Sequence, residues 1–205
     1  MGEFRFEDIE NRKTLITGEV GIGKTELTAL LLREAISRVG SSEIAVLDFA
    51  PSRRAIRGFT IGGRITDFLP SPGCRIHEPS VQIRAPRLEG RSSGEVLKLA
   101  QDNARTTSAL LWQYVACPTS CLFINDLTIH LQAGDVGLLL SGIGLSRTFV
   151  GNAYSGSSLA PDHGSGLSLR EAENLKAVGR AMDIVLNTDQ VKRGVEMKRS
   201  STMPE

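Results

Sequence analysis

A glycine-rich segment near the N-terminus constrains the fold of this chain more than any other feature. Residues 18–25 match the pattern G-x-x-x-x-G-K-[ST] at every position. A short strand-like run at 13–17 precedes the segment, and apolar periodicity predicts a helix at 24–39 directly after it. A loop between a strand and a helix N-terminus presents backbone N–H groups to an anion, and the helix dipole favours negative charge there. This context favours a phosphate-binding loop over a tight glycine turn that matches by chance.

The pattern also assigns roles to individual side chains. The Lys24 ammonium is expected to reach the outer phosphates of a nucleotide, and the Thr25 hydroxyl is expected to ligate Mg²⁺. The sequence therefore predicts that the chain binds ATP or GTP together with Mg²⁺. The residues expected to contact the nucleotide are Gly18, Glu19, Val20, Gly21, Ile22, Gly23, Lys24, Thr25 and Glu26.

Apolar runs alternate with helical patterns along the rest of the chain. Further strands are expected at residues 43–49, 120–126, 147–152 and 182–187, and further helices at 93–114, at 134–141 and from 168 onward. This alternation is typical of a parallel sheet covered by crossover helices. The sequence thus predicts an α/β fold, a three-layer α/β/α sandwich with a mostly parallel sheet of about five strands. A length of 205 residues suits one such domain, spanning residues 1–205.

Residues 52–92 interrupt the alternation and are expected to form an insertion within the domain. The segment is rich in Arg, Gly and Pro, with short β-like runs at 60–65 and 80–84, and it holds eight of the arginines. A mobile arginine can stabilise charge on a transferred phosphoryl group, and an arginine cluster can bind an anionic small molecule or a protein partner. A solvated surface is an equally good interpretation. The arginines from Arg53 to Arg91 are left with these alternatives.

The apolar run at 120–126 ends on two polar residues, Asn125 and Asp126. An aspartate at the end of a buried strand holds the Mg²⁺ shell in many nucleotide-binding proteins, so Asp126 is a candidate metal and catalytic residue. The alternative is an aspartate that caps the turn after the strand. Residue 127 is leucine, so the chain lacks a glutamate directly after this aspartate.

Together these motifs resemble the P-loop NTPases. Within that superfamily the chain is similar to the division that holds the signal-recognition GTPases, the partition ATPases and the dethiobiotin-synthetase-like enzymes. There the second strand ends in an acid followed by a turn, and Asp48 with Pro51 stands at the corresponding place. The resemblance implies that Asp48 contacts the Mg²⁺ shell or orients the attacking water. Two positions depart from the division's pattern: Glu19 replaces its signature lysine, and Ala50 replaces its second acid.

The identity of the base is less strongly indicated. Guanine recognition is typical of an N-K-x-D motif after a late strand, and the nearest match, residues 187–189, lacks the lysine and the spacing. A polar turn after the last strand explains these residues better. ATP is therefore the favoured nucleotide.

Composition bears mainly on partners and compartment. A net charge of +1 gives no overall attraction to nucleic acid, and few aromatic residues accompany the arginines, so nucleic acid is not a supported partner. No apolar run approaches the ~18 residues of a membrane span, and three cysteines cannot all pair within the chain, which favours a cytoplasmic protein with reduced thiols. Cys74 with His77, and Cys117 with Cys121, have spacings that a zinc site tolerates, but core thiols explain them better. A homodimer is left open.

Three functions fit these observations, in descending order of support. The first is Mg²⁺-dependent hydrolysis of a nucleoside triphosphate coupled to conformational change or partner engagement, with Lys24, Asp48 and Asp126 as the catalytic residues. The second is an ATP-dependent kinase or ligase that acts on an anionic small molecule held by the segment 52–92. The third is a nucleotide-dependent sensor or assembly protein that does not hydrolyse.

Overall fold

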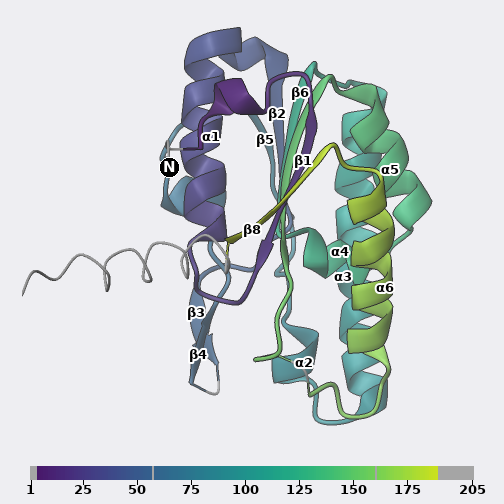
Figure 1. Ribbon diagram of the computed structural model, residues 1–205. Helices are drawn as coiled ribbons and strands as arrows, with labels where there is room; N and C mark the ends of the chain where they lie inside the picture. The colour runs from purple at the N-terminus through teal and green to yellow at the C-terminus, as the bar shows by residue number, and fades with distance from the viewer. Residues whose placement is uncertain (1–3, 57, 160, 189–205) are drawn as a thin grey trace, which may run out of the picture.

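A single parallel sheet forms the centre of the molecule in the computed structural model, which describes residues 4–56, 58–159 and 161–188. The sheet has six strands in the order β5-β2-β6-β7-β1-β8, and every neighbouring pair runs parallel (Figure 1). The strands are β1 (Lys13–Gly18), β2 (Ile44–Asp48), β5 (Arg75–His77), β6 (Cys121–Asn125), β7 (Thr148–Tyr154) and β8 (Ile184–Asn187).

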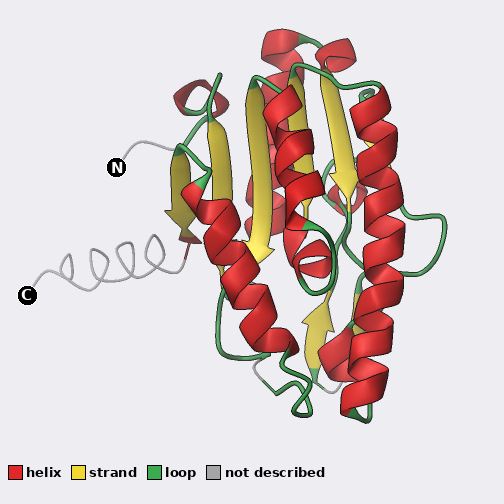
Figure 2. Cartoon of the chain, turned by 90° about the vertical axis from the view of Figure 1, so that its right-hand side faces the viewer, coloured by secondary structure: helices red, strands yellow, loops and turns green. Residues whose placement is uncertain are grey.

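Helices cover both faces of this sheet. One face packs against α1 (Lys24–Val39), and the other carries the remaining long helices, which lie in front of the strands in Figure 2. These are α3 (Ser93–Ala116), the short α4 (Leu127–Leu131), α5 (Val136–Leu145) and α6 (Leu167–Arg180). The three-layer α/β/α sandwich predicted from the sequence is therefore confirmed.

The central strands are buried on both faces, as their continuous apolar runs predict. Every residue of β2, β6 and β7 is buried. Two separate apolar clusters result, one between the sheet and α1, and one between the sheet and the helices of the opposite face. The predicted strands at 43–49, 120–126 and 147–152 thus lie at the centre of the fold.

The segment 52–92 is more structured than its composition indicates. It forms an antiparallel hairpin of β3 (Arg54–Ile56) and β4 (Phe59–Ile61), a 3-10 turn η3 (Ile65–Asp67), and the short helix α2 (Pro86–Glu89). It also supplies β5, which pairs with β2 and makes the sheet six-stranded rather than five-stranded. The β-like run expected at 80–84 is not a strand. A short apolar run forms a strand only where it lies next to another strand, and β5 occupies the position beside β2. Two further 3-10 turns, η1 (Phe6–Asp8) and η2 (Ser41–Glu43), flank β1 and β2.

The strand order separates the two motif-bearing strands. β7 lies between β1 and β6, and neighbouring strands are ~4.8 Å apart, so the glycine-rich loop and the end of β6 are separated by one strand. The carboxyl ends of all six strands meet at one edge of the sheet, the edge beside which the β3–β4 hairpin and α2 lie (Figure 1). Among the residues that the structure describes, no helix is both long and apolar enough to cross a membrane.

Candidate functional site

The glycine-rich loop runs from the end of β1 to the start of α1. Gly21 and Gly23 adopt φ values of 74° and 91°, in the left-handed region that glycine enters without steric cost. A Cβ at Gly21 would meet no atom within 4 Å, so backbone conformation, and not crowding, requires glycine there. The first N–H groups of α1 lack carbonyl partners within the helix, and they begin at Lys24. The local geometry is that of an anion-binding loop.

The two motif side chains that follow the loop are held in place by hydrogen bonds. The Lys24 Nζ donates to the carbonyl oxygens of Gly18 at 2.9 Å and Glu19 at 2.6 Å. The Thr25 Oγ1 donates to Asn125 Oδ1 at 3.3 Å. Thr25 therefore connects the start of α1 to the end of β6, across the intervening β7.

A cavity of about 450 Å³ opens at this edge of the sheet. Its walls come from the glycine-rich loop, the loops after β2, β6 and β7, the β3–β4 hairpin and α2, and the edge formed by strand carboxyl ends is where parallel sheets generally bind ligands. The predicted residues that line it are Val20, Gly21, Gly23, Lys24, Thr25, Glu26 and Asp126, joined by Arg53, Arg87, Thr128, Gln132, Asn152 and Tyr154. Asp48 is not among its lining residues.

Two buried amides connect the strand ends beneath this cavity. Asn125 Nδ2 donates to Asp48 Oδ1 at 2.8 Å and to the Gly63 carbonyl at 2.9 Å, while its Oδ1 accepts from Thr25 and from Asn152 Nδ2. The Asn152 Oδ1 in turn accepts from the Asp126 N–H at 3.0 Å. Sequence reasoning named Asn125 only as the residue before Asp126, and it assigned a role to neither amide. The available signal was a polar side chain inside an otherwise apolar strand, at the end of β6 and within β7.

Asp126 directly follows β6 and adopts a left-handed conformation, with φ 58° and ψ 60°. A residue other than glycine in this region is strained, and such strain is found preferentially at functional sites. Burial raises the pKa of the Asp126 carboxyl, while the Lys24 charge, the Thr128 hydroxyl and the Arg87 charge act in the opposite direction. A carboxylate with a raised pKa beside a loop of anion-binding geometry can accept a proton from water.

The structure places Asp48 below the cavity and fully buried. Its Oδ1 accepts from the Ala50 N–H at 3.2 Å and from Asn125, and its Oδ2 accepts from the Ile65 N–H at 2.7 Å. Burial raises its pKa to about 6, although the three donors favour the charged form. Asp48 therefore anchors the segment after β2, including η3, to the end of the sheet.

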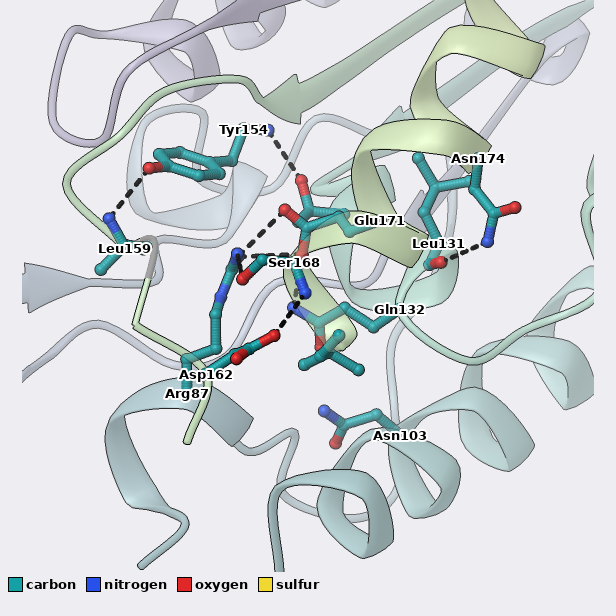
Figure 3. Close-up of polar contacts among 12 residues, drawn as sticks. Arg87, Asn103, Leu131, Gln132, Tyr154, Leu159, Asp162, Ser168, Glu171 and Asn174 are labelled. Carbon is teal, nitrogen blue, oxygen red and sulfur yellow. Dashed lines mark hydrogen bonds and ion pairs between the residues drawn. The ribbon is translucent and has the colours of Figure 1, made fainter. Parts of the chain in front are cut away.

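A buried ion pair joins Arg87, which lines the cavity, to Glu171 (Figure 3). The Arg87 Nη2 donates to both carboxylate oxygens of Glu171, at 3.0 and 2.9 Å, and both side chains are more than nine-tenths buried. Gln132 Nε2 donates to the same carboxylate at 2.9 Å, and the Arg87 guanidinium lies 5.3 Å from the centroid of the Tyr154 ring. The pair joins α2, which belongs to the segment 52–92, to α6.

Loss of one partner of this pair is expected to destabilise the fold. Glu171→Ala leaves the Arg87 charge buried without its carboxylate, which costs about 3 kcal/mol of unfolding free energy; the effect is at the low end of the usual range because Arg87 borders the cavity and water can reach it. Urea denaturation measures the change. Asp102→Ala, which removes the partner of Arg105 in an exposed pair, is the control and is expected to cost less than about 1 kcal/mol. Equal losses in the two variants would contradict the structural role of Glu171.

Other arginines of the segment 52–92 also have carboxylate partners. Arg54 and Arg84 both pair with Glu89, and Arg64 pairs with Glu78 at 2.7 Å. Arg53 is exposed and lines the cavity. These ion pairs fold the segment onto itself, and recognition of an anionic acceptor or a protein partner by its arginines stays a prediction. Arg57 lies outside the described residues.

Glu19 connects the glycine-rich loop to the segment that follows β7. Its carboxylate accepts from the N–H groups of Val20 at 2.8 Å, Ser157 at 2.9 Å and Ser158 at 3.2 Å. Burial opposes ionisation of this group, but the backbone donors outweigh it and the pKa of Glu19 is lowered. A Cβ at Gly156 would lie 2.3 Å from the carboxylate, so a larger residue there would displace the Glu19 side chain from these contacts.

The remaining sequence hypotheses concern residues away from the cavity. Burial raises the pKa of the Cys121 thiol to about 12, which favours a core thiol over a metal ligand, and within the described residues no group of three or more His, Cys, Asp or Glu could hold a metal ion. Asn187 ends β8 and Thr188 follows it, while Asp189 lies outside the described part of the chain.

Comparison with known proteins does not assign this chain to a family. No protein-family model matches the chain, and no curated protein sequence matches it. Among solved structures, the crystal structure of the Pyrococcus furiosus Hef helicase domain is similar over 89% of this chain and 36% of that chain, with a TM-score of 0.40 and 10% sequence identity. The chain thus spans about a third of the length of that neighbour, and what it binds is argued from its own residues.

Proposed function

We propose that the protein binds a nucleoside triphosphate, ATP in preference to GTP, and hydrolyses it with Mg²⁺. One observation carries the proposal: Lys24 and Thr25 line the same cavity as Asp126, which lies about 100 residues later in the sequence. The cavity lies beside a loop whose glycines hold the conformation of an anion-binding turn. Hydrolysis would be coupled to conformational change or to engagement of a partner, through the loops that surround the cavity.

The oxygen-bearing side chains near the loop suit Mg²⁺, which prefers oxygen ligands and needs only one or two from the protein. The Thr25 hydroxyl and the Asp126 carboxylate would hold the ion, with Asn125 Oδ1 orienting the hydroxyl. When bound, Mg²⁺ supplies neutralisation of the phosphate charge. Lys24 would contact the outer phosphates by exchanging its contacts with the Gly18 and Glu19 carbonyls for phosphate oxygens.

Asp126 is assigned a second role, as the group that orients the attacking water and accepts its proton. Its position in the cavity and its raised pKa support this role. Asp126 follows the end of β6 with a left-handed backbone, and it lines the cavity from there. Asp48 is assigned a positioning role in place of contact with metal or water, because its carboxylate oxygens accept from three donors of the protein below the cavity. The narrower resemblance to the signal-recognition and partition division relied on Asp48, so that division is not part of the proposal.

A second candidate is an ATP-dependent phosphotransferase or ligase. Ile129, Gln132 and Arg87 also line the cavity and lie outside the glycine-rich loop, so they are candidates to contact an acceptor in place of the nucleotide phosphates. Consumption of ATP that depends strictly on an added acceptor would distinguish this activity from simple hydrolysis.

Phosphate release tests the proposal directly. The purified protein is expected to release phosphate steadily from Mg·ATP, more slowly from Mg·GTP, and not at all in excess EDTA. Release that is independent of the added protein concentration would contradict hydrolysis by this chain. Binding without release would favour the phosphotransferase, or a sensor that does not hydrolyse.

A further inference from the structure

A second hollow continues from the cavity along the outer side of α1. It has a volume of about 490 Å³ and is lined by Leu27, Leu30 and Arg33 of α1, and by Phe68. Gly21, Gly23, Glu26 and Phe68 line both hollows, so they adjoin at the glycine-rich loop. We call this second hollow the α1 groove.

The positions of Asp126 and the glycine-rich loop indicate which end of a bound nucleotide holds the terminal phosphate and which end holds the base. Asp126 follows the carboxyl end of β6 and lines the cavity together with Asn152 of β7, and the terminal phosphate would react beside these two residues. The rest of the nucleotide must therefore leave the loop elsewhere. Glu26, in the first turn of α1, lines both hollows, and the path over this turn leads into the α1 groove.

Phe68 stands where the two hollows meet. The residue is 39% exposed, so part of its ring is open to a ligand in either hollow. It directly follows η3, and its support is rigid: the Ile65 side chain is fully buried, and the Ile65 N–H donates to the Asp48 carboxylate at 2.7 Å. Asp48 thus holds the turn that presents Phe68.

We propose that the α1 groove binds the heteroaromatic base of the nucleotide, with Phe68 as the surface on which the base stacks. The inference rests on the proposed function, because it places the base of the same nucleotide whose phosphates bind the loop. A flat base needs an apolar surface and a polar rim. Leu27, Leu30 and Phe68 supply the first, and the exposed side chains of Glu26 and Arg33 supply the second. Glu26 is an acceptor for the amino group of a base, such as that of adenine.

The test compares ATP with inorganic triphosphate, which has the phosphates but no base. Phe68→Ala is expected to weaken ATP binding about tenfold, the effect of losing one base–aromatic stack, and to leave the affinity for inorganic triphosphate unchanged. Phe68→Tyr keeps the ring and is expected to bind both ligands as the wild type does. Trp112→Ala is the matched control, since Trp112 is an exposed aromatic residue on α3 that lines neither hollow. Titration calorimetry with Mg²⁺ present measures all four proteins.

Phe68→Leu provides a second variant if Phe68→Ala does not fold, because leucine retains apolar volume without an aromatic face. Loss of ATP affinity alone, in either variant, supports the base site. Equal loss for ATP and inorganic triphosphate, or no loss for either, would overturn it. If the wild type bound neither ATP nor inorganic triphosphate, the proposed function would be overturned, and the base site with it.

Discussion

Replacement of Lys24 by alanine is expected to weaken nucleotide binding about 100-fold or more. The Lys24 ammonium lies at the cavity beside the glycine-rich loop, where it donates to the carbonyl oxygens of Gly18 and Glu19. A phosphate oxygen is a stronger acceptor for an ammonium than a carbonyl is, and loss of a close charge pair at a partly buried site costs 2–5 kcal/mol, roughly 30- to several thousand-fold in affinity.

Equilibrium binding of ATP and GTP to folded Lys24→Ala protein measures this loss. Lys98→Ala is the matched control, because Lys98 is an exposed lysine on α3 and its replacement removes the same charge from the chain. The control is expected to bind as the wild type does. Unchanged affinity for both nucleotides in Lys24→Ala would refute the phosphate-binding role of the loop.

Replacement of Asp126 by asparagine is expected to slow phosphate release by about 10²- to 10⁴-fold, the usual contribution of a group that accepts a proton in the transition state. The amide has nearly the same shape as the carboxyl group but cannot take up the proton. Nucleotide affinity is expected to change less than the rate, because Lys24, Thr25 and the loop N–H groups remain and the amide oxygen of asparagine can still ligate Mg²⁺. Single-turnover measurements at saturating Mg·ATP separate the rate from the affinity.

The pH dependence gives Asp126 a second signature. Burial raises the pKa of Asp126 in the metal-free protein and a bound Mg²⁺ lowers it, so the carboxylate that accepts the proton forms as the pH rises through a range that Mg²⁺ shifts downward. The rate of phosphate release by the wild type is therefore expected to increase with pH through this range. In Asp126→Asn the rate is expected not to increase with pH. Asp102→Asn changes an exposed carboxylate on α3 and is expected to alter neither the rate nor its pH profile. An unchanged pH profile in Asp126→Asn would exclude Asp126 as the proton acceptor.

The local parts of this protein could be predicted from its sequence. The loop at 18–25, the helix after it and the apolar strands depend on glycine conformation, helix periodicity and continuous burial, all of which are patterns within about 20 residues. The alternation of these elements was enough for the three-layer fold. The position of Asp126 directly after a buried strand was likewise a local pattern, and the structure places it in the cavity.

The tertiary structure decided which distant residues meet. A hydrogen bond joins Asn152 to Asn125 because β7 lies next to β6, and Glu171 neutralises Arg87 because the fold brings this residue of α6 to this residue of α2. Asp48 ends its strand as expected, but the chain that returns through η3 covers it and removes it from the cavity wall. Neither strand order nor chain return leaves a short-range pattern, because both result from the joint burial of apolar surface on elements far apart in the sequence.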